Sequence, residues 1–128
     1  MSSLICVIDD DRSVLRALRR LLRAEAFAVE VFVSAEQFLA SEQRARAGCL
    51  VLDVNLKGLS GLELQAQLVL GGKPPPIVFI TAFDDRNARE RACRAGAVAY
   101  LRKPFDDNAL LDAVNRALRG PGSVVEKA

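Results

Sequence analysis

Acidic side chains stand directly after two apolar runs of the chain. Asp9, Asp10 and Asp11 follow the run LICVI, and Asp53 is the last residue of the run CLVLD. A turn after a strand needs at most one aspartate, so the other carboxylates must have another role. Two carboxylates about 5 Å apart repel each other by roughly 3 kcal/mol at an effective dielectric constant of ~20. If these acids meet in the folded chain, a cation must lie among them.

A hydroxyl group and an ammonium group stand at corresponding places. Thr81 ends the run IVFIT, and Lys103 follows the run AVAYL. The sequence has no histidine, and no cysteine is placed to join the acids, so the metal ligands would all be oxygen atoms. Oxygen ligands favour Mg²⁺ or Mn²⁺. A carboxylate beside such an ion and a lysine can act as a nucleophile and form an aspartyl phosphate, with Thr81 hydrogen-bonded to a phosphoryl oxygen.

Alternating strands and helices would bring these residues to one place. The apolar runs predict strands over 4–8, 28–32, 49–53, 77–81 and 97–101. The amphipathic stretches predict helices over 14–22, 35–42, from a cap at Ser60 to about Leu70, 85–95 and 107–118. Five such units predict an α/β domain, a doubly wound parallel sheet with helices on both faces. Ligands of such sheets bind at the carboxyl ends of the strands, where the polar residues stand.

Finer patterns describe the individual elements. The alternation in 28–32 predicts an edge strand, Ser34 with Gln37 predicts a capping box, and Gly96 predicts a helix end. The predicted inward-facing residues are Val14, Leu18, Leu21 and Leu22 in the first helix and Leu110, Leu111, Val114 and Leu118 in the last.

Composition and charge narrow the class of protein. The 128 residues are 51% hydrophobic and 27% charged, which fits one globular domain. The net charge of +2 is too small to indicate binding of nucleic acid. No apolar run is long enough for a membrane span, and the N-terminus does not read as a secretory signal. We expect a cytoplasmic domain whose cysteines, Cys6, Cys49 and Cys93, are reduced and mostly buried.

Four segments, VIDDDRSV, LVLDVNLKGLSGLEL, IVFITA and YLRKPF, together resemble the receiver domain of two-component response regulators. The resemblance covers residues 4–118. It implies a flavodoxin-like (βα)5 fold with the strand order 2-1-3-4-5. We therefore expect a receiver domain over 1–120 and a tail, or the start of a linker, over 121–128.

The resemblance assigns a role to each acid by its position. Asp53 matches the phosphoacceptor, and Asp10 matches the direct metal ligand. Asp9 matches the acid that holds the metal through water. Asn55 stands where a backbone carbonyl binds the metal. The implied cofactor is Mg²⁺, with Mn²⁺ as a possible substitute.

The resemblance also assigns the residues that bind and sense the phosphoryl group. Thr81, Ala82 and Lys103 match the phosphoryl-binding positions, and Thr81 with Tyr100 matches the switch pair. The peptide bond between Lys103 and Pro104 is the one that is usually cis in this family.

Some positions depart from the family pattern or vary within it. Lys57 stands where the family commonly has proline. We expect the lysine either to make the loop less rigid or to add a cation near the phosphate. Asp11 is expected to begin the first helix rather than to bind metal. Asn55 and Phe83 lie at positions that vary in the family and tune the lifetime of the phosphoryl group.

The resemblance implies phosphoryl transfer from a sensor histidine kinase, or a phosphotransfer protein, to Asp53, followed by slow hydrolysis and no further enzymatic activity. One alternative is a phosphatase with an aspartyl nucleophile, but such enzymes place a second aspartate where this chain has Asn55. Another is a receiver-like interaction module that never needs phosphate. The segments LSGLE and AGAVAYLRKPF are most similar to receivers that precede a helix-turn-helix output domain.

Two surfaces could contact partner proteins. The charges over 85–118 are of opposite sign on neighbouring helices, which favours a phosphorylation-dependent homodimer. The residues Arg12, Arg16, Arg19 and Arg23 share one helical face, which is either a solvated surface or a docking patch for an acidic partner helix.

Overall fold

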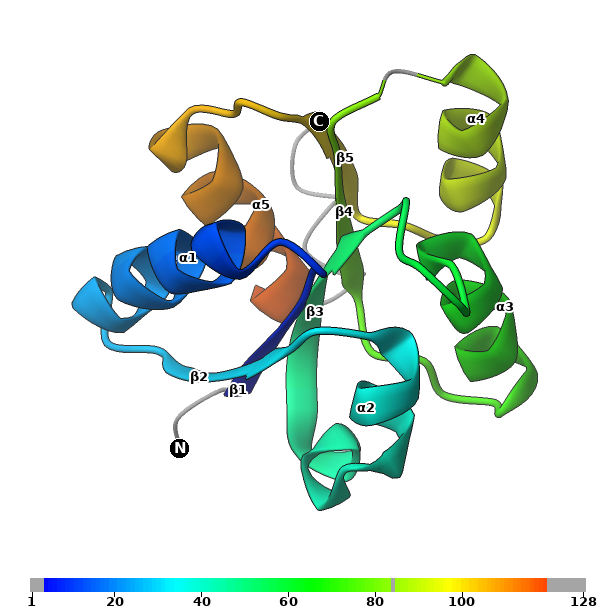
Figure 1. The fold of residues 1–128 in the computed structure, drawn as a ribbon, viewed down its shortest axis with the longest axis horizontal. Coiled ribbons are helices and arrows are strands. Elements are labelled where there is room, and N and C mark those ends of the chain that lie inside the picture. Colours follow the sequence, from blue (N-terminus) through cyan, green and yellow to red (C-terminus); the bar gives the residue numbers. More distant parts are fainter. Residues whose placement is uncertain (1–3, 84, 120–128) are drawn as a thin grey trace.

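The chain folds as alternating strands and helices, and the computed structural model describes residues 4–83 and 85–119 (Figure 1). The strands are β1 (Leu4–Ile8), β2 (Ala28–Phe32), β3 (Ala47–Asp53), β4 (Ile77–Thr81) and β5 (Ala99–Arg102). The helices are α1 (Arg12–Ala24), α2 (Ala35–Ala40), α3 (Gly61–Leu70), α4 (Arg86–Arg94) and α5 (Asp107–Arg119), with a 3₁₀ helix η1 (Glu42–Arg46). The tail or linker expected over 121–128 lies outside the described residues.

The strands form one parallel sheet in the order β2-β1-β3-β4-β5. Helices α1 and α5 cover one face, and α2, α3 and α4 cover the other (Figure 1). The predicted flavodoxin-like fold and strand order are therefore confirmed. The predicted edge position of β2 is also confirmed, since β2 pairs with β1 alone.

Two hydrophobic cores form because successive strand residues point to opposite faces of the sheet. In β1, Ile5 and Val7 face the core under α1 and α5, whereas Cys6 and Ile8 face the core under α2, α3 and α4. All residues of β1 and β4 are buried, as expected for strands covered on both sides. The two cores hold the sheet from both faces and so fix the positions of the carboxyl ends of the strands.

Several boundaries and one cap differ from those predicted. Strand β3 begins at Ala47 rather than at residue 49. Helix α2 ends at Ala40 rather than at residue 42, because Ser41 has an extended backbone and its hydroxyl caps η1. The last strand spans residues 99–102 rather than 97–101. The Gln37 side-chain oxygen accepts from the Val33 N–H, one residue before Ser34, so the predicted capping box is displaced by one residue.

Helices α1 and α5 bury partly different residues from those predicted. In α1, Leu15, Leu18 and Leu22 are buried, while Val14 and Leu21 are only partly buried. In α5 the buried residues are Leu110, Ala113, Val114 and Ala117, while Leu111 and Leu118 are partly buried. Ala113 and Ala117 are small and buried, which lets α5 pack closely on the sheet.

The prediction for the cysteines is confirmed for two residues and wrong for the third. Cys6 and Cys49 are buried free thiols, and burial raises the pKa of each to about 12. Cys93 is also free but exposed. It follows the buried Ala92 on α4 and therefore faces solvent.

The outer surface of α1 is basic and solvated. Arg12, Arg16, Arg19 and Arg23 are all exposed. Among the described helices, none combines the length and the hydropathy of a membrane-spanning segment.

Gly61→Ala should lower the free energy of unfolding by about 1–3 kcal/mol. A Cβ at this position would lie 2.3 Å from the Asp53 carbonyl oxygen and 3.0 Å from the Val54 Cα, and neither backbone atom can rotate away. Gly71→Ala at the other end of α3 is the matched control, because its Cβ would lie no closer than 3.4 Å to the Leu68 carbonyl oxygen. We expect less than about 0.5 kcal/mol for the control, measured by urea denaturation. Equal losses in both variants would contradict the proposed close approach.

Candidate functional site

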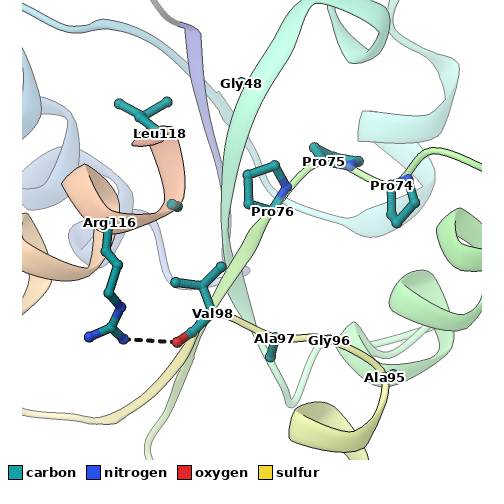
Figure 2. A pocket seen from close by; sticks show the side chains of 11 residues that line it. Gly48, Pro74, Pro75, Pro76, Ala95, Gly96, Ala97, Val98, Arg116 and Leu118 are labelled. Carbon is teal, nitrogen blue, oxygen red and sulfur yellow. Dashed lines mark hydrogen bonds between the residues drawn. The ribbon is translucent and has the colours of Figure 1, made fainter. Parts of the chain in front are cut away.

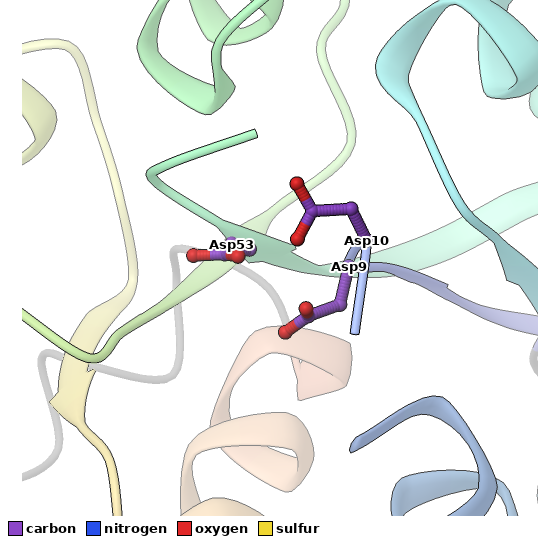
Figure 3. Close-up of side chains that lie close together, drawn as sticks. All are labelled: Asp9, Asp10 and Asp53. Carbon is purple, nitrogen blue, oxygen red and sulfur yellow. The ribbon is translucent and has the colours of Figure 1, made fainter. Parts of the chain in front are cut away.

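Three acids meet where β1 and β3 end. Asp9 and Asp10 follow β1, Asp53 ends β3, and these strands are neighbours in the sheet. One carboxylate oxygen from each residue lies within 4.8 Å of the others. Figure 3 shows the Asp9 and Asp10 side chains extending toward the side on which Asp53 lies. The structure therefore brings together the acids that the sequence placed at one edge of the sheet.

Lys103 brings a positive charge into this cluster from the end of β5. Its ammonium nitrogen donates to Asp9 Oδ2 at 2.8 Å and lies 3.7 Å from Asp53 Oδ2. Asp9 is fully buried and also accepts a hydrogen bond from the Asp11 N–H. One ammonium among three carboxylates leaves an excess of negative charge.

This excess changes the acidity of Asp53. Burial and the negative charge of Asp9 raise the pKa of Asp53 to about 6 from an ordinary value of 3.8. The Asn55 N–H and the Lys103 ammonium act in the opposite direction but do not offset the burial. Ionised Asp53 is therefore destabilised, and a bound cation would relieve that cost.

The site fits a hard divalent cation. All three acidic ligands offer carboxylate oxygens, and the cluster has the negative charge that Mg²⁺ neutralises. The backbone of Asn55 lies at the same edge, because its N–H donates to Asp53 Oδ1 at 3.1 Å. Asp9, Asp10, Asp53 and the Asn55 carbonyl are thus the residues that would hold the ion.

Asp10 and Asp11 have separate roles. Asp10 is partly exposed and accepts a hydrogen bond from the Lys57 N–H at 3.2 Å. Asp11 is the N-cap of α1, and its carboxylate accepts hydrogen bonds from the Ser13 N–H and hydroxyl. These bonds lower the pKa of Asp11. The prediction that Asp11 begins the helix is confirmed.

Thr81 is fully buried at the end of β4 and is directed toward its own loop. Its hydroxyl donates to the Phe83 carbonyl at 2.9 Å and accepts from the Asn55 side-chain amide at 3.1 Å. The Lys103 N–H donates to the Thr81 carbonyl at 2.7 Å, which joins the ends of β4 and β5. The two residues predicted to bind the phosphoryl group are therefore joined by a backbone hydrogen bond.

The other predicted residues surround this pair. Ala82 and Phe83 are exposed after β4, and Phe83 has 70% of its surface accessible. The peptide bond between Lys103 and Pro104 is cis.

Tyr100 is half-buried and packs inward. Its ring centroid lies 6.1 Å from that of Phe79, and its hydroxyl oxygen is buried. The guanidinium carbon of Arg89, on α4, lies 5.9 Å from the ring centroid. Tyr100 thus joins the core of the sheet to the surface of α4.

Sequence reasoning missed three contacts of this site. The Lys57 N–H that donates to Asp10 is a backbone group, so the type of residue at position 57 does not predict this hydrogen bond. The other two contacts join residues far apart in the chain. The Asn55 side-chain amide donates to the Thr81 hydroxyl, and the Leu59 N–H donates to the Glu36 carboxylate. The motif spacing gives the acids but does not show which loop groups they meet.

A pocket of about 630 Å³ lies at the opposite edge of the sheet, at the amino ends of β3, β4 and β5 (Figure 2). Proline residues 74–76, the segment 95–98 and the end of α5 line it, and Arg116 donates to the Val98 carbonyl at 2.9 Å. The acids do not line this pocket, so it is separate from the site.

Comparison with known proteins identifies relatives of this chain. The model of the response regulator receiver domain family matches residues 5–115. The response regulator protein TodT of Pseudomonas putida is 42% identical over 118 residues, which are 92% of this chain and 52% of TodT. Nodulation protein W of Bradyrhizobium diazoefficiens is 44% identical over 112 residues, 88% of this chain and 49% of that protein. The chain spans about half the length of these curated relatives.

Solved structures agree with these matches. The response regulator StyR is 43% identical, with a TM-score of 0.87 over 99% of this chain and 64% of that chain. The FixJ-N structure is 33% identical, with a TM-score of 0.85 over 94% of this chain and 97% of that chain. By sequence match and by fold, this chain belongs to the response regulator receiver domain family.

Proposed function

We propose that this chain accepts a phosphoryl group on Asp53, with Mg²⁺, in a two-component signalling system. The observation that carries the proposal is the meeting of three carboxylates, within 4.8 Å of one another, with an ammonium that contacts two of them. Asp53 is the acid at the end of the central strand β3. The donor would be a sensor histidine kinase or a phosphotransfer protein.

The chain's own residues would position and neutralise the reacting groups. An Asp53 carboxylate oxygen attacks phosphorus, and the bond from phosphorus to the donor's imidazole nitrogen breaks with its electron pair leaving on nitrogen. When bound, Mg²⁺ neutralises charge on the phosphoryl oxygens. Lys103, now paired with Asp9, would contact a phosphoryl oxygen, and the Thr81 hydroxyl would leave Phe83 to bind another.

The surface beside the site suits a phosphodonor protein. A groove of about 380 Å³ lies between α1 and the segment 103–107, and Lys103 itself lines it. Its walls are mostly apolar, and the exposed arginines of α1 lie on the same helix. An acidic partner helix in this groove would bring a phosphohistidine close to Asp53.

Two other functions are less well supported. A phosphatase with an aspartyl nucleophile needs a general acid two residues later, but Asn55 cannot donate a proton in that way and its amide binds Thr81. An interaction module without phosphate would not need the buried Asp9–Lys103 pair beside Asp53, which costs desolvation. The acidic cluster favours the phosphoacceptor.

The signal would leave the site through Thr81, Tyr100 and the surface of α4, β5 and α5. Tyr100 already packs inward in this structure, with its ring near Phe79 and its hydroxyl oxygen buried. Movement of Thr81 toward the phosphoryl group would stabilise this arrangement of Tyr100 and Arg89. Exposed arginines on α4 and exposed Asp107 and Asp112 on α5 give the face both charges, which suits a symmetric dimer.

Incubation with acetyl phosphate, or with a phosphohistidine donor, and Mg²⁺ should label wild-type protein on Asp53. The label should be absent in Asp53→Asn, because the amide is not a nucleophile. It should fall by orders of magnitude in Asp10→Asn or in EDTA, because the phosphoryl charge is then not neutralised. Intact mass spectrometry measures the added phosphoryl group.

Asp11→Asn is the control for that experiment, because Asp11 caps α1 and should not affect the label beyond about twofold. Label that persists on Asp9 or Asp10 in Asp53→Asn would contradict the assignment. Equal labelling with and without EDTA would contradict the metal's role.

Metal-free protein should lose stability relative to Asp53→Asn as pH rises from 4 to 7. The raised pKa of Asp53, about 6, means that the folded state binds the proton more tightly than the unfolded chain. The cost of ionising Asp53 is thus absent below pH ~4 and complete above pH ~6. Urea denaturation in EDTA at both pH values measures the difference. Mg²⁺ at pH 7 should stabilise the wild type more than the variant, and a difference independent of pH would contradict the assignment.

Beryllofluoride with Mg²⁺ should raise the mass measured by light scattering toward that of a dimer. A related receiver, that of DrrB, has been solved in a BeF3-activated form. Thr81→Ala and Tyr100→Ala should weaken the response, because both break the route from Asp53 to α4. A tenfold shift in population needs only ~1.4 kcal/mol. An activated protein that stays monomeric, with amide shifts confined to the surroundings of Asp53, would exclude this route.

A further inference from the structure

The loop between β3 and α3 is held by backbone N–H groups that donate to carboxylates. The donors and acceptors are Asn55 to Asp53 at 3.1 Å, Lys57 to Asp10 at 3.2 Å, Leu59 to Glu36 at 2.9 Å and Ser60 to Glu63 at 2.8 Å. Two of these acids belong to the acidic site, and Glu63 belongs to the first turn of α3. Glu36, in the first turn of α2, ties the loop to a helix outside the acidic site.

Glu36 lies directly against the turn of the loop. Gly58 has a φ of +73°, and a Cβ there would lie 2.7 Å from Glu36 Oε2. The absence of a side chain at Gly58 therefore leaves space for the Glu36 carboxylate. The Leu59 N–H bond lowers the pKa of Glu36, so the ionised form of Glu36 favours this contact.

The loop that Glu36 holds also carries the groups that orient the metal ligands. Lys57 lies two residues before Leu59, and its N–H fixes the Asp10 carboxylate. A proline at this position, which the family commonly has, could not supply that N–H. In this chain the position of Asp10 therefore depends on the place of the loop.

We propose that Glu36 is a positioning residue for the metal site, acting through the Leu59 N–H on the loop that bears Lys57 and Asn55. The proposal rests on the proposed Mg²⁺-dependent function. Glu36 is not one of the three clustered acids that would hold the ion. It holds the loop so that the Lys57 N–H orients Asp10 and the Asn55 carbonyl stays at the site.

A Mg²⁺ titration of the full chain, followed by backbone amide shifts, tests the proposal without any phosphoryl transfer. Glu36→Ala should bind Mg²⁺ about tenfold more weakly, at the low end of the range for residues that orient metal ligands. Glu36→Gln should stay within about twofold of wild type, since its side-chain oxygen still accepts the Leu59 N–H. Exchange of the Leu59 amide hydrogen should be faster in Glu36→Ala and slow in Glu36→Gln.

The two variants separate this role from a charge effect on α2. A negative charge near a helix N-terminus stabilises the helix, and both variants remove that charge. If Glu36 served only that purpose, Glu36→Gln would resemble Glu36→Ala in stability, and Mg²⁺ affinity would change in neither.

Lys57 provides the second arm of the test. Lys57→Pro removes the N–H and should weaken Mg²⁺ binding, whereas Lys57→Ala keeps the N–H and should stay within about twofold of wild type. Because both steps lie on one route, Glu36→Ala combined with Lys57→Pro should weaken binding no more than the stronger single variant. Fully additive losses would overturn the proposed route.

The outcomes distinguish this proposal from the proposed function. Wild type that does not bind Mg²⁺, or Asp10→Asn that binds it equally well, would refute the metal site itself. Wild type that binds Mg²⁺ while Glu36→Ala binds it with unchanged affinity and exchanges Leu59 faster would overturn the role of Glu36 alone.

Discussion

The buried ion pair between Lys103 and Asp9 is the contact around which the rest of the site is arranged. It joins the end of β5 to the end of β1 across two intervening strands, with 2.8 Å between Nζ and Oδ2. Asp9 is fully buried, so removing either partner would leave an unpaired charge inside the protein. Because all the strands run parallel, their carboxyl ends lie at one edge of the sheet, which brings Lys103 and Asp9 close enough to pair.

The same arrangement of acids lowers the stability of the metal-free fold. Burial and a neighbouring carboxylate raise the pKa of Asp53 to about 6, which means that the ionised Asp53 carboxylate is destabilised in the metal-free fold. Phosphoacceptor chemistry needs a carboxylate close to a cation and a lysine, and these groups are costly to gather without the ion. The two hydrophobic cores, which cover both faces of the sheet, provide the compensating stability.

The loops that follow β3 and β4 hold the side chains of the site in place through hydrogen bonds. Within residues 55–60, the backbone N–H groups of Asn55, Lys57, Leu59 and Ser60 donate to carboxylates from the site and from two helices. Thr81 is held by Asn55 from this loop and by Phe83 from the next. The Asn55 amide therefore joins the two loops, and Phe79, also on β4, packs against the Tyr100 ring that Arg89 covers.

The sequence by itself determined the order of elements and the edge at which Asp9, Asp10, Asp53, Thr81 and Lys103 meet, because apolar runs and strand ends are local patterns. The strand order 2-1-3-4-5 was implied by the resemblance to receiver domains and confirmed by the structure. It could not determine every buried residue of α1 and α5, since Leu15 and Ala113 are buried while the predicted Leu111 is only partly so. The exposure of Cys93 and the contacts of Lys57 and Glu36 were likewise decided only by tertiary structure. Backbone N–H groups are the same in every residue except proline, and their partners are fixed by the path of the folded chain.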